Sequence, residues 1–567
     1  MDRRPQLDVA RRAAVSRVKL FPLALPLLMM ALSAPHATQA TPQSPLSLIK
    51  RVYAAKRWKE VVRLTPPERQ DAPGIDYYRG MALAKLNRWD EAQTAFLRGW
   101  RKAPQDKRFP TELAGVAFTR KNCGAAKTYL RRALKIDPHD AYALNFLATI
   151  YDLDGNLPAA LKYWNRLQQP RIRDIRVTPQ PSVNPVLLNR AFAFSPDATL
   201  EASQWLTTQA RIDSFGIFLR PRLDLTPLPD GRFDAKFIAK ERNGWGDSTP
   251  QGAASLLRGV PYDTIYPTFF NLGHSATNLT SLVRWDPQKQ RIYAALDGPI
   301  GESAQWRYRV HLDGRRENWN LSSTFFGSAT PVRDMRMEKL EGGADIESIA
   351  SGRLRWDTGF DLSGRSFRRV EWSDPSAAAF FTDGFALESH SSVHYLVLEV
   401  PERRLNVESG AGARLGKVFT RSANSFLQSE AGLRARWHPR ARGDDYEMTA
   451  QLRAGKTWGT PPFDNLFILG LERDNNLWLR AHIGTADGKK GSAPLGRDYV
   501  LFNWDDFKTL FQNGLLSLRL GPFLDSGKIT DPSRDFGSRR WLLDAGLELK
   551  AQVMGAATVE LFFGKDL

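Results

Sequence analysis

The sequence predicts a multidomain protein with an α-helical repeat, a small α/β module and a C-terminal transmembrane antiparallel β-barrel of about 16 strands. Three observations lead to this fold class. A helical pattern recurs about every 34 residues between positions 75 and 170. Strand and helix patterns follow one another between 171 and 246, and apolar and polar residues alternate from 255 to 567. A chain of 567 residues is also too long for one ordinary domain.

The first 40 residues have the regions of a secretory signal peptide. The first 19 positions hold six Arg or Lys residues and two Asp, residues 20–34 are apolar, and the small residues Ala37 and Ala40 come just before Thr41. The apolar run is too short to cross a membrane as a helix, and two prolines interrupt it. We therefore expect residues 1–40 to be a cleaved signal peptide, with an uncleaved signal anchor as the alternative. No later stretch has the length and apolar character of a transmembrane helix.

The charge and cysteine content exclude some classes of function. Lys and Arg outnumber Asp and Glu by 80 to 61, but the basic residues are spread along the chain without a run of five. Nucleic acid is therefore not an expected partner. Cys123 is the only cysteine, which excludes an internal disulfide and a cysteine-based metal site.

Residues 41–170 are predicted to form paired helices. Small and large apolar residues recur at matching positions of successive units, and those of the first unit are Gly80, Leu83, Trp89, Ala92, Phe96 and Pro104. Small residues let the paired helices approach, and large residues fill the space between repeats. The pattern resembles tetratricopeptide repeats. This resemblance implies a concave surface for a periplasmic partner protein, and a structural spacer is the alternative.

Residues 171–246 are predicted to form a small module with the order strand, helix, helix, strand, strand. Residues 171–179 alternate like a strand, and Asn184 followed by Pro185 is typical of a helix start. Later alternating runs flank Pro229, Asp230 and Gly231, which form a turn signal. The order, together with the step from Gly216 to Phe218, resembles a POTRA domain. In that family an exposed strand edge binds extended client segments by strand addition.

Residues 255–567 are predicted to form an outer-membrane β-barrel. In RLRWDTGFDLSG, Trp356, Phe360 and Leu362 share one face, while Asp357 and Asp361 lie on the other. Repeated strands of about ten residues with this pattern, in an exported chain, are typical of a barrel with lipid outside and a polar lumen inside. Six arginines are expected to face the interior and make it basic: Arg353, Arg355, Arg434, Arg436, Arg453 and Arg519.

Two short motifs in the barrel region suggest a contact inside the lumen. Leu479, Arg480, Ala481 and His482 follow a strand, and Phe523, Asp525 and Gly527 share the inward face of a later strand. These motifs, with the domain order, resemble the bacterial surface antigen superfamily of BamA, TamA and the two-partner secretion transporters. The resemblance implies that a long extracellular loop folds into the lumen and that Arg480 binds Asp525. An arginine fork suits this role because it can bind a carboxylate with two hydrogen bonds.

Parts of the first motif depart from the family pattern and leave alternatives. Ala481 replaces the usual glycine and His482 the usual aromatic residue, so His482 is expected to stack on Phe523 or to make no contact. Arg497 is the alternative loop arginine, because an aromatic residue follows it closely. On the wall strand, Gly521 and Gly527 are expected to leave Asp525 open to its partner.

The resemblance implies a non-enzymatic transporter in the bacterial outer membrane, with its N-terminal domains in the periplasm. The expected function is insertion or translocation of unfolded or extended polypeptides, with outer-membrane lipid around the barrel and without cofactor or metal. No catalytic motif opposes this reading: the sequence has no nucleophile elbow, no H-E-x-x-H and no P-loop. The alternative function is export of an acidic polysaccharide, which a basic lumen would also suit.

Overall fold

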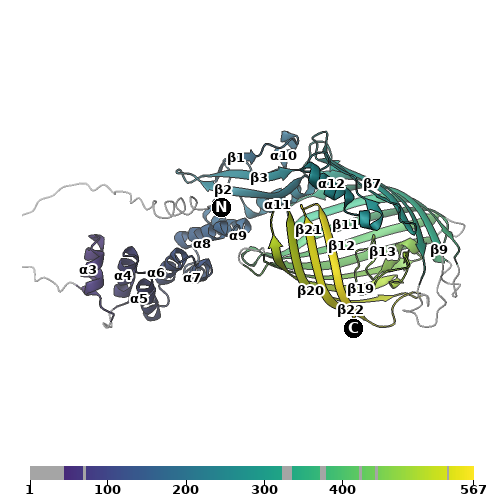
Figure 1. Ribbon diagram of the computed structural model, residues 1–567. Coiled ribbons are helices and arrows are strands. Elements are labelled where there is room, and N and C mark those ends of the chain that lie inside the picture. The colour runs from purple at the N-terminus through teal and green to yellow at the C-terminus, as the bar shows by residue number, and fades with distance from the viewer. Residues whose placement is uncertain are drawn as a thin grey trace, which may run out of the picture. The chain divides into compact units, whose positions relative to one another are not determined.

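A computed structural model describes residues 44–67, 72–321, 335–370, 379–419, 424–440, 445–532 and 536–567 (Figure 1). The chain divides into two compact units, Met1–Leu153 and Asp154–Leu567. The predicted signal peptide lies outside the described residues. Within the described part of the chain, no helix combines the length and the apolar character needed to cross a membrane.

The first unit consists of successive helices that pack through small residues. They are α2 (Pro45–Ala54), α3 (Trp58–Leu64), α4 (Pro73–Lys85), α5 (Trp89–Lys102), α6 (Arg108–Thr119), α7 (Cys123–Ile136) and α8 (Ala141–Leu153). A Cβ atom on Gly80 of α4 would lie 2.5 Å from the ring of Phe96 on α5. Only glycine therefore allows these helices to approach so closely. The helices have the expected order, while membership of the tetratricopeptide family stays a prediction.

The second unit begins with α9 (Leu157–Trp164), the short helix η1 (Asn165–Leu167) and a three-stranded α/β module. The module contains β1 (Ile172–Thr178), α10 (Pro185–Ala191), α11 (Ala202–Ser214), β2 (Phe218–Pro227) and β3 (Phe233–Glu241). Its strand order is β1-β3-β2, with β1 parallel and β2 antiparallel to the central β3. The Asn184 side chain accepts a hydrogen bond from the Val186 amide and caps α10. The element order is the predicted one, while assignment to the POTRA family stays a prediction.

A large antiparallel sheet forms the rest of this unit. Its long strands are β5 (Thr268–Leu272), β6 (Thr277–Arg284), β7 (Lys289–Pro299), β8 (Trp306–Trp319), β9 (Met335–Ile349), β10 (Leu354–Arg368), β11 (Gly384–Val400), β12 (Leu405–Phe419), β13 (Asn424–Trp437), β14 (Tyr446–Gly459), β19 (Asp498–Gln512), β20 (Leu516–Thr530), β21 (Leu542–Val553) and β22 (Ala557–Asp566). Each strand pairs with the next one in this order, and the sheet curls so that one face is turned inward (Figure 1).

The described residues contain 17 strands of this sheet, three of which have only two residues: β4 (Thr264–Ile265), β16 (Thr485–Ala486) and β17 (Lys489–Lys490). The structure confirms the large antiparallel sheet, while a barrel of about 16 strands stays a prediction. A helix that the sequence did not predict, α12 (Thr249–Leu257), precedes the sheet and extends past position 255, where the barrel was expected to begin.

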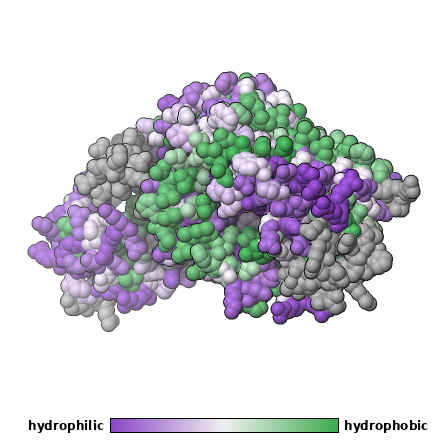
Figure 2. Space-filling view, turned by 45° about the vertical axis from the view of Figure 1, so that its right-hand side comes forward, coloured by the Kyte–Doolittle hydropathy of each residue, from purple (hydrophilic) through white to green (hydrophobic). Residues whose placement is uncertain are grey.

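The two faces of the sheet differ sharply in polarity. On β10, Phe360 and Leu362 are 58% and 55% exposed, whereas Asp361 between them is 5% exposed and faces inward. Leucine, valine and phenylalanine side chains are exposed in the same way on most other strands. Figure 2 shows hydrophobic residues gathered over a broad area of one side of the molecule. An apolar outer face with charged groups inside is the pattern of a sheet that meets lipid.

The connections at the two ends of the sheet differ in length. Residues 401–404, 513–515 and 554–556 form short connections at one end, whereas residues 460–497 form a long connection at the other. The helix and module residues contact the short end: the Asn156 side chain donates to the Pro401 carbonyl at 2.7 Å, and the Gly352 amide donates to Thr207 Oγ1 at 3.0 Å. The α/β module therefore lies opposite the long connection.

Candidate functional site

The long connection between β14 and β19, residues 460–497, folds onto the inner face of the sheet, and we call it the inner loop. Within it, β15 (Phe467–Ile468) pairs with β18 (Leu495–Gly496). The buried side chains of Leu469, Leu477 and Leu479 pack with Leu501, Ile529 and Leu542 of the wall strands. Apolar packing therefore brings the loop inward, and its polar groups must find partners there.

Arg480 of the inner loop binds Asp525 of β20 through three hydrogen bonds. The guanidinium donates from Nε to Asp525 Oδ2 at 2.9 Å and from Nη2 to Oδ1 at 2.6 Å. The Arg480 backbone amide also donates to Oδ2 at 3.0 Å, and Asn503 Nδ2 donates to Oδ1 at 2.7 Å. The Asp525 carboxylate thus has four donors, which offsets the cost of complete burial.

The third nitrogen of the same guanidinium contacts two more carboxylates. Arg480 Nη1 donates to Glu548 Oε2 of β21 at 2.7 Å and also to Asp505 Oδ1 of β19. One buried cation therefore joins three adjacent strands through three carboxylates. Burial alone would lower the pKa of Arg480, but the Asp525 and Asp505 carboxylates raise it above its ordinary value. The guanidinium stays charged.

The aromatic ring of Phe523 packs against the guanidinium of Arg480. The guanidinium carbon of Arg480 lies 4.1 Å from the centre of the Phe523 ring, a cation–π distance. Gly546 of β21 and Gly564 of β22 leave room for the ring, since a Cβ atom on either would lie 2.8 Å or 2.7 Å from it. These two glycines could not be assigned to the site from the sequence, because they lie on strands without the motif.

Gly521 and Gly527 were both expected to leave Asp525 open to its partner, and they have different surroundings in the structure. A Cβ atom on Gly521 would lie 2.1 Å from the Asp506 carbonyl oxygen, so this glycine permits close approach of two strands. A Cβ atom on Gly527 would lie 3.2 Å from the side chains of Leu469 and Leu501. Gly521 therefore serves the pairing of β19 with β20, whereas Gly527 leaves room for Leu469 of the inner loop.

His482 was expected to stack on Phe523 or to make no contact, and instead it binds a different wall residue, Asp544. Its Nδ1 atom lies 2.7 Å from Asp544 Oδ1 on β21, and the Ala481 amide donates to Asp544 Oδ2 at 2.6 Å. The His482 amide donates to the Leu479 carbonyl at 3.1 Å, closing a tight turn over Arg480. The alanine in the motif leaves this turn intact, and the histidine adds a second hydrogen-bonded contact with the wall.

Arg497, the alternative loop arginine, lies elsewhere. Its Nε atom is 3.1 Å from Asp531 Oδ2, its Nη1 donates to the Gly459 carbonyl at 3.1 Å, and its guanidinium carbon lies 5.4 Å from the Phe380 ring centre. The structure therefore brings Arg480, and not Arg497, to Asp525.

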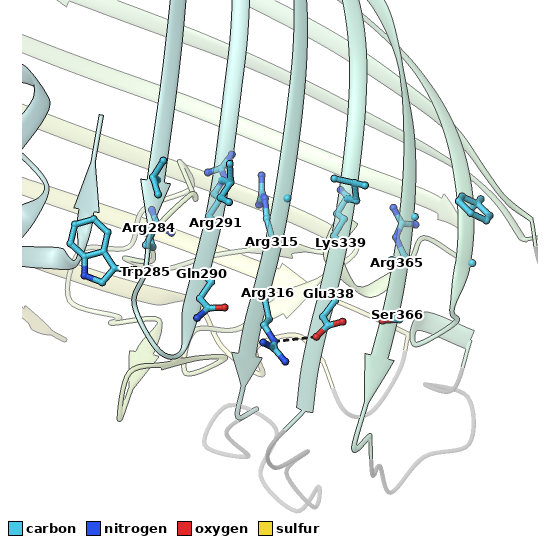
Figure 3. Close-up of a pocket in the computed structure, with 17 residues that line it drawn as sticks. Arg284, Trp285, Gln290, Arg291, Arg315, Arg316, Glu338, Lys339, Arg365 and Ser366 are labelled. Carbon is cyan, nitrogen blue, oxygen red and sulfur yellow. Dashed lines mark ion pairs between the residues drawn. The ribbon is translucent and has the colours of Figure 1, made fainter. Parts of the chain in front are cut away.

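A second set of contacts holds the opposite side of the inner loop, and the sequence analysis missed it. Acidic loop residues meet basic residues of the early strands: Glu472 Oε1 lies 3.0 Å from Lys289 Nζ, and Asp474 Oδ2 lies 2.8 Å from Arg284 Nη1. Figure 3 shows Arg284, Arg291, Arg315, Lys339 and Arg365 in a row across neighbouring strands. Their common feature, a cation near the end of each strand, is visible in the sequence only once the strands are aligned.

Further ion pairs extend these contacts. Asp464 Oδ2 lies 2.9 Å from Lys339 Nζ, and the loop cation Lys490 lies 2.7 Å from Glu317 Oε1 of β8. Burial would raise the pKa of Asp474, but its hydrogen bond with Arg284 and the charge of Lys490 lower it overall, so this carboxylate stays ionised. The inner loop is therefore ionically bound to both the early and the late strands.

Three of the six arginines that were expected to make the interior basic are paired with carboxylates. Arg519 Nη1 lies 2.8 Å from Glu447, Arg436 Nε lies 3.5 Å from the same carboxylate, and Arg353 Nη2 lies 3.7 Å from Glu399. Alternation placed these arginines on the inner face but could not show the carboxylates opposite them. The inner face carries paired charges of both signs.

Neither a protein-family model nor a curated protein matches this chain. Among solved structures, it is similar to BamA from Haemophilus ducreyi lacking POTRA domains 1–3, with 12% identity, 70% of this chain and 81% of that chain covered, and a TM-score of 0.41. It is also similar to CdiB from Escherichia coli, with 11% identity, coverage of 70% and 73%, and a TM-score of 0.47. MamA matches 22% of this chain and 73% of its own, with 17% identity and a TM-score of 0.21. These likenesses are weak, so we base the functional proposal on the residues of this chain.

Proposed function

We propose that this protein lies in the bacterial outer membrane and inserts or translocates polypeptides there, with its N-terminal helices and α/β module in the periplasm. The observation that carries the proposal is the two-faced sheet, apolar outside and charged inside, in one compact unit with the α/β module. The apolar face suits lipid, and the charged inner face with its bound loop suits a hydrated passage.

The α/β module supplies a place where an extended client could bind. Strand β2 forms an edge of the order β1-β3-β2, so its outer hydrogen-bonding groups face away from the sheet. On β2, Leu223 and Leu225 are buried, whereas Arg222 and Asp224 are exposed. A client strand added to this edge would gain backbone hydrogen bonds without a specific sequence, as a general polypeptide transporter requires.

The inner loop is proposed to brace the wall and narrow the lumen while a client passes. Ion pairs to early and late strands hold it on two sides, so the strands cannot spread without breaking buried charge contacts. Client passage needs no nucleotide or cofactor in this mechanism. Export of an acidic polysaccharide remains the rival function, but the paired arginines of the inner face give it no specific support.

Depletion of the protein tests the proposal against its rival. Loss of assembled outer-membrane proteins or of secreted proteins, with normal surface polysaccharide, is the expected result. Lost polysaccharide with normal protein profiles would overturn the proposal. A photo-reactive amino acid at Asp224, on the β2 edge, should capture a client polypeptide, and the same probe at Arg176, on the opposite edge strand β1, serves as the matched control.

A further inference from the structure

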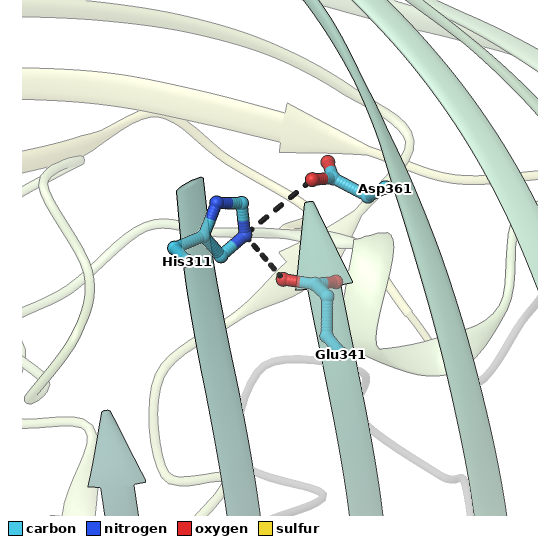
Figure 4. Close-up of side chains that lie close together, drawn as sticks. All are labelled: His311, Glu341 and Asp361. Atoms are coloured by element: carbon cyan, nitrogen blue, oxygen red, sulfur yellow. Dashed lines mark ion pairs between the residues drawn. The ribbon is translucent and has the colours of Figure 1, made fainter. Parts of the chain in front are cut away.

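Three side chains on neighbouring strands converge on one point of the inner face, away from the Arg480 contact. His311 lies on β8, Glu341 on β9 and Asp361 on β10, and all three point toward one another (Figure 4). His311 Nε2 lies 3.4 Å from Asp361 Oδ1 and 3.8 Å from Glu341 Oε1. The three potential ligand atoms all lie within 4.8 Å of one another.

The backbone makes room for this arrangement. Gly343 of β9 lies directly opposite His311 on one side and Asp361 on the other. A Cβ atom at this position would lie 2.0 Å from Asp361 Oδ1 and 2.4 Å from His311 Cε1. Any other residue at 343 would therefore occupy the space in which the imidazole and the carboxylate meet.

Asp361 is a buried carboxylate whose Oδ1 atom is aimed into this space, where it meets the His311 ring nitrogen at 3.4 Å but accepts no hydrogen bond from a described residue. The residue is 5% exposed, and its Oδ1 atom has no hydrogen-bond partner among the described residues. A buried carboxylate oxygen without a donor is costly in free energy. A cation between Asp361, His311 and Glu341 would satisfy it.

The second oxygen of each carboxylate, Glu341 Oε2 and Asp361 Oδ2, contacts another side chain. These contacts orient the first oxygen of each carboxylate toward His311. Lys339 Nζ lies 2.7 Å from Glu341 Oε2, which leaves Oε1 toward His311. His390 Nδ1 lies 3.3 Å from Asp361 Oδ2, and His390 Nε2 lies 2.7 Å from Asp345 Oδ1. Such outer contacts fix ligand orientation in metal sites and strengthen binding.

We propose that His311, Glu341 and Asp361 form a binding site for a divalent transition-metal ion of the Zn²⁺ class. One imidazole nitrogen and two carboxylate oxygens are donors that Zn²⁺ accepts, with water in the remaining position. His311 Nε2 lies 3.4 and 3.8 Å from the two carboxylate oxygens. With small side-chain movements, an ion placed between these atoms can reach all three with metal–ligand bonds of about 2.0–2.2 Å. The bound ion would cross-link β8, β9 and β10 at mid-wall.

Metal titration of the purified full chain in detergent tests this site. After chelation and dialysis, we expect one Zn²⁺ per chain by calorimetry, confirmed by elemental analysis. X-ray absorption should show only nitrogen and oxygen ligands, including one imidazole. The variants His311→Ala and Glu341→Gln should each weaken Zn²⁺ binding at least about tenfold.

A histidine of the same wall provides the control. His394 lies on β11, four positions after His390 and on the same face, but outside the cluster. His394→Ala should bind Zn²⁺ like the unmodified chain. The proposal is overturned if the folded unmodified chain takes up no stoichiometric Zn²⁺, or if uptake survives both His311→Ala and Glu341→Gln. Equal loss in His394→Ala would likewise overturn it, because binding would then not depend on this cluster.

Discussion

The two sides of the inner loop are bound to the wall by opposite charge arrangements. Toward the late strands, one loop cation, Arg480, meets the carboxylates of Asp525, Asp505 and Glu548. Toward the early strands, several loop carboxylates meet separate cations, as in the pair of Glu472 with Lys289. The first side concentrates its ion pairs on Arg480, with His482 as one further contact, whereas the second distributes them over several loop residues, including the cation Lys490. A single substitution should therefore disturb the first side far more than the second.

Arg480→Ala should have the largest effect. It would leave the completely buried Asp525 without its cation and the nearly buried Glu548 with Lys550 alone, at a cost of about 3–5 kcal/mol. The measurement is the unfolding free energy of the full chain in detergent. Arg480→Lys should lose less, since it keeps the charge but not the two-pronged geometry.

Exchanging the charges of Arg480 and Asp525 tests how far the contact depends on the other two carboxylates. The double variant Arg480→Glu with Asp525→Arg should recover only part of the lost stability, because the new glutamate would face Glu548 and Asp505. Full recovery would show that Asp525 alone accounts for the contact. Arg497→Ala, which removes a loop arginine that contacts Asp531, the Gly459 carbonyl and Phe380 but not Asp525, is the matched control.

Lys289→Met tests the contacts of the inner loop with the early strands and should lower the unfolding free energy less than Arg480→Ala does. Glu472 would keep hydrogen bonds from the Arg473 amide and the Thr485 hydroxyl, so the expected cost is about 1–3 kcal/mol. The unfolding free energy of this variant should lie between those of Arg480→Ala and the unmodified chain. A loss equal to that of Arg480→Ala would contradict the contrast between the two sides.

The contact of His482 with Asp544 should make stability depend on pH. Burial lowers the pKa of His482, but the hydrogen bond and charge of Asp544 raise it overall. A raised folded pKa means that the stabilisation is complete below the unfolded value of about 6.5 and is lost as pH rises through the folded pKa. Tm in detergent should therefore fall over that range, and His482→Gln should remove this part of the pH dependence. An unchanged pH profile in the variant would count against the charged pair.

Arg519→Ala should have the smallest effect of the series. Its side chain is 40% exposed and pairs with Glu447, which also lies near Arg436. Loss of such a solvated pair should change the unfolding free energy by about 0–1 kcal/mol. A loss comparable with that of Arg480→Ala would show that the inner face is shielded from water at this position.

The sequence alone determined the features that depend on local periodicity. Alternation identified the strands and their outward faces, and the proline and asparagine before α10 marked its start. The motif around Arg480 and Asp525 was found because both residues stand in short, recognisable runs. Family membership, domain boundaries and transport itself stay predictions.

Only the tertiary structure decided which charges meet. Glu472 and Lys289 are separated by 183 residues, and neither stands in a motif, so no local pattern joins them. The same holds for Gly546 and Gly564, which make room for Phe523, and for the cluster of His311, Glu341 and Asp361 on three strands. Strand periodicity fixes the face on which a side chain lies, but the register between strands fixes its neighbours. The partners of the inner loop are therefore decided by the register between strands and cannot be found from strand periodicity alone.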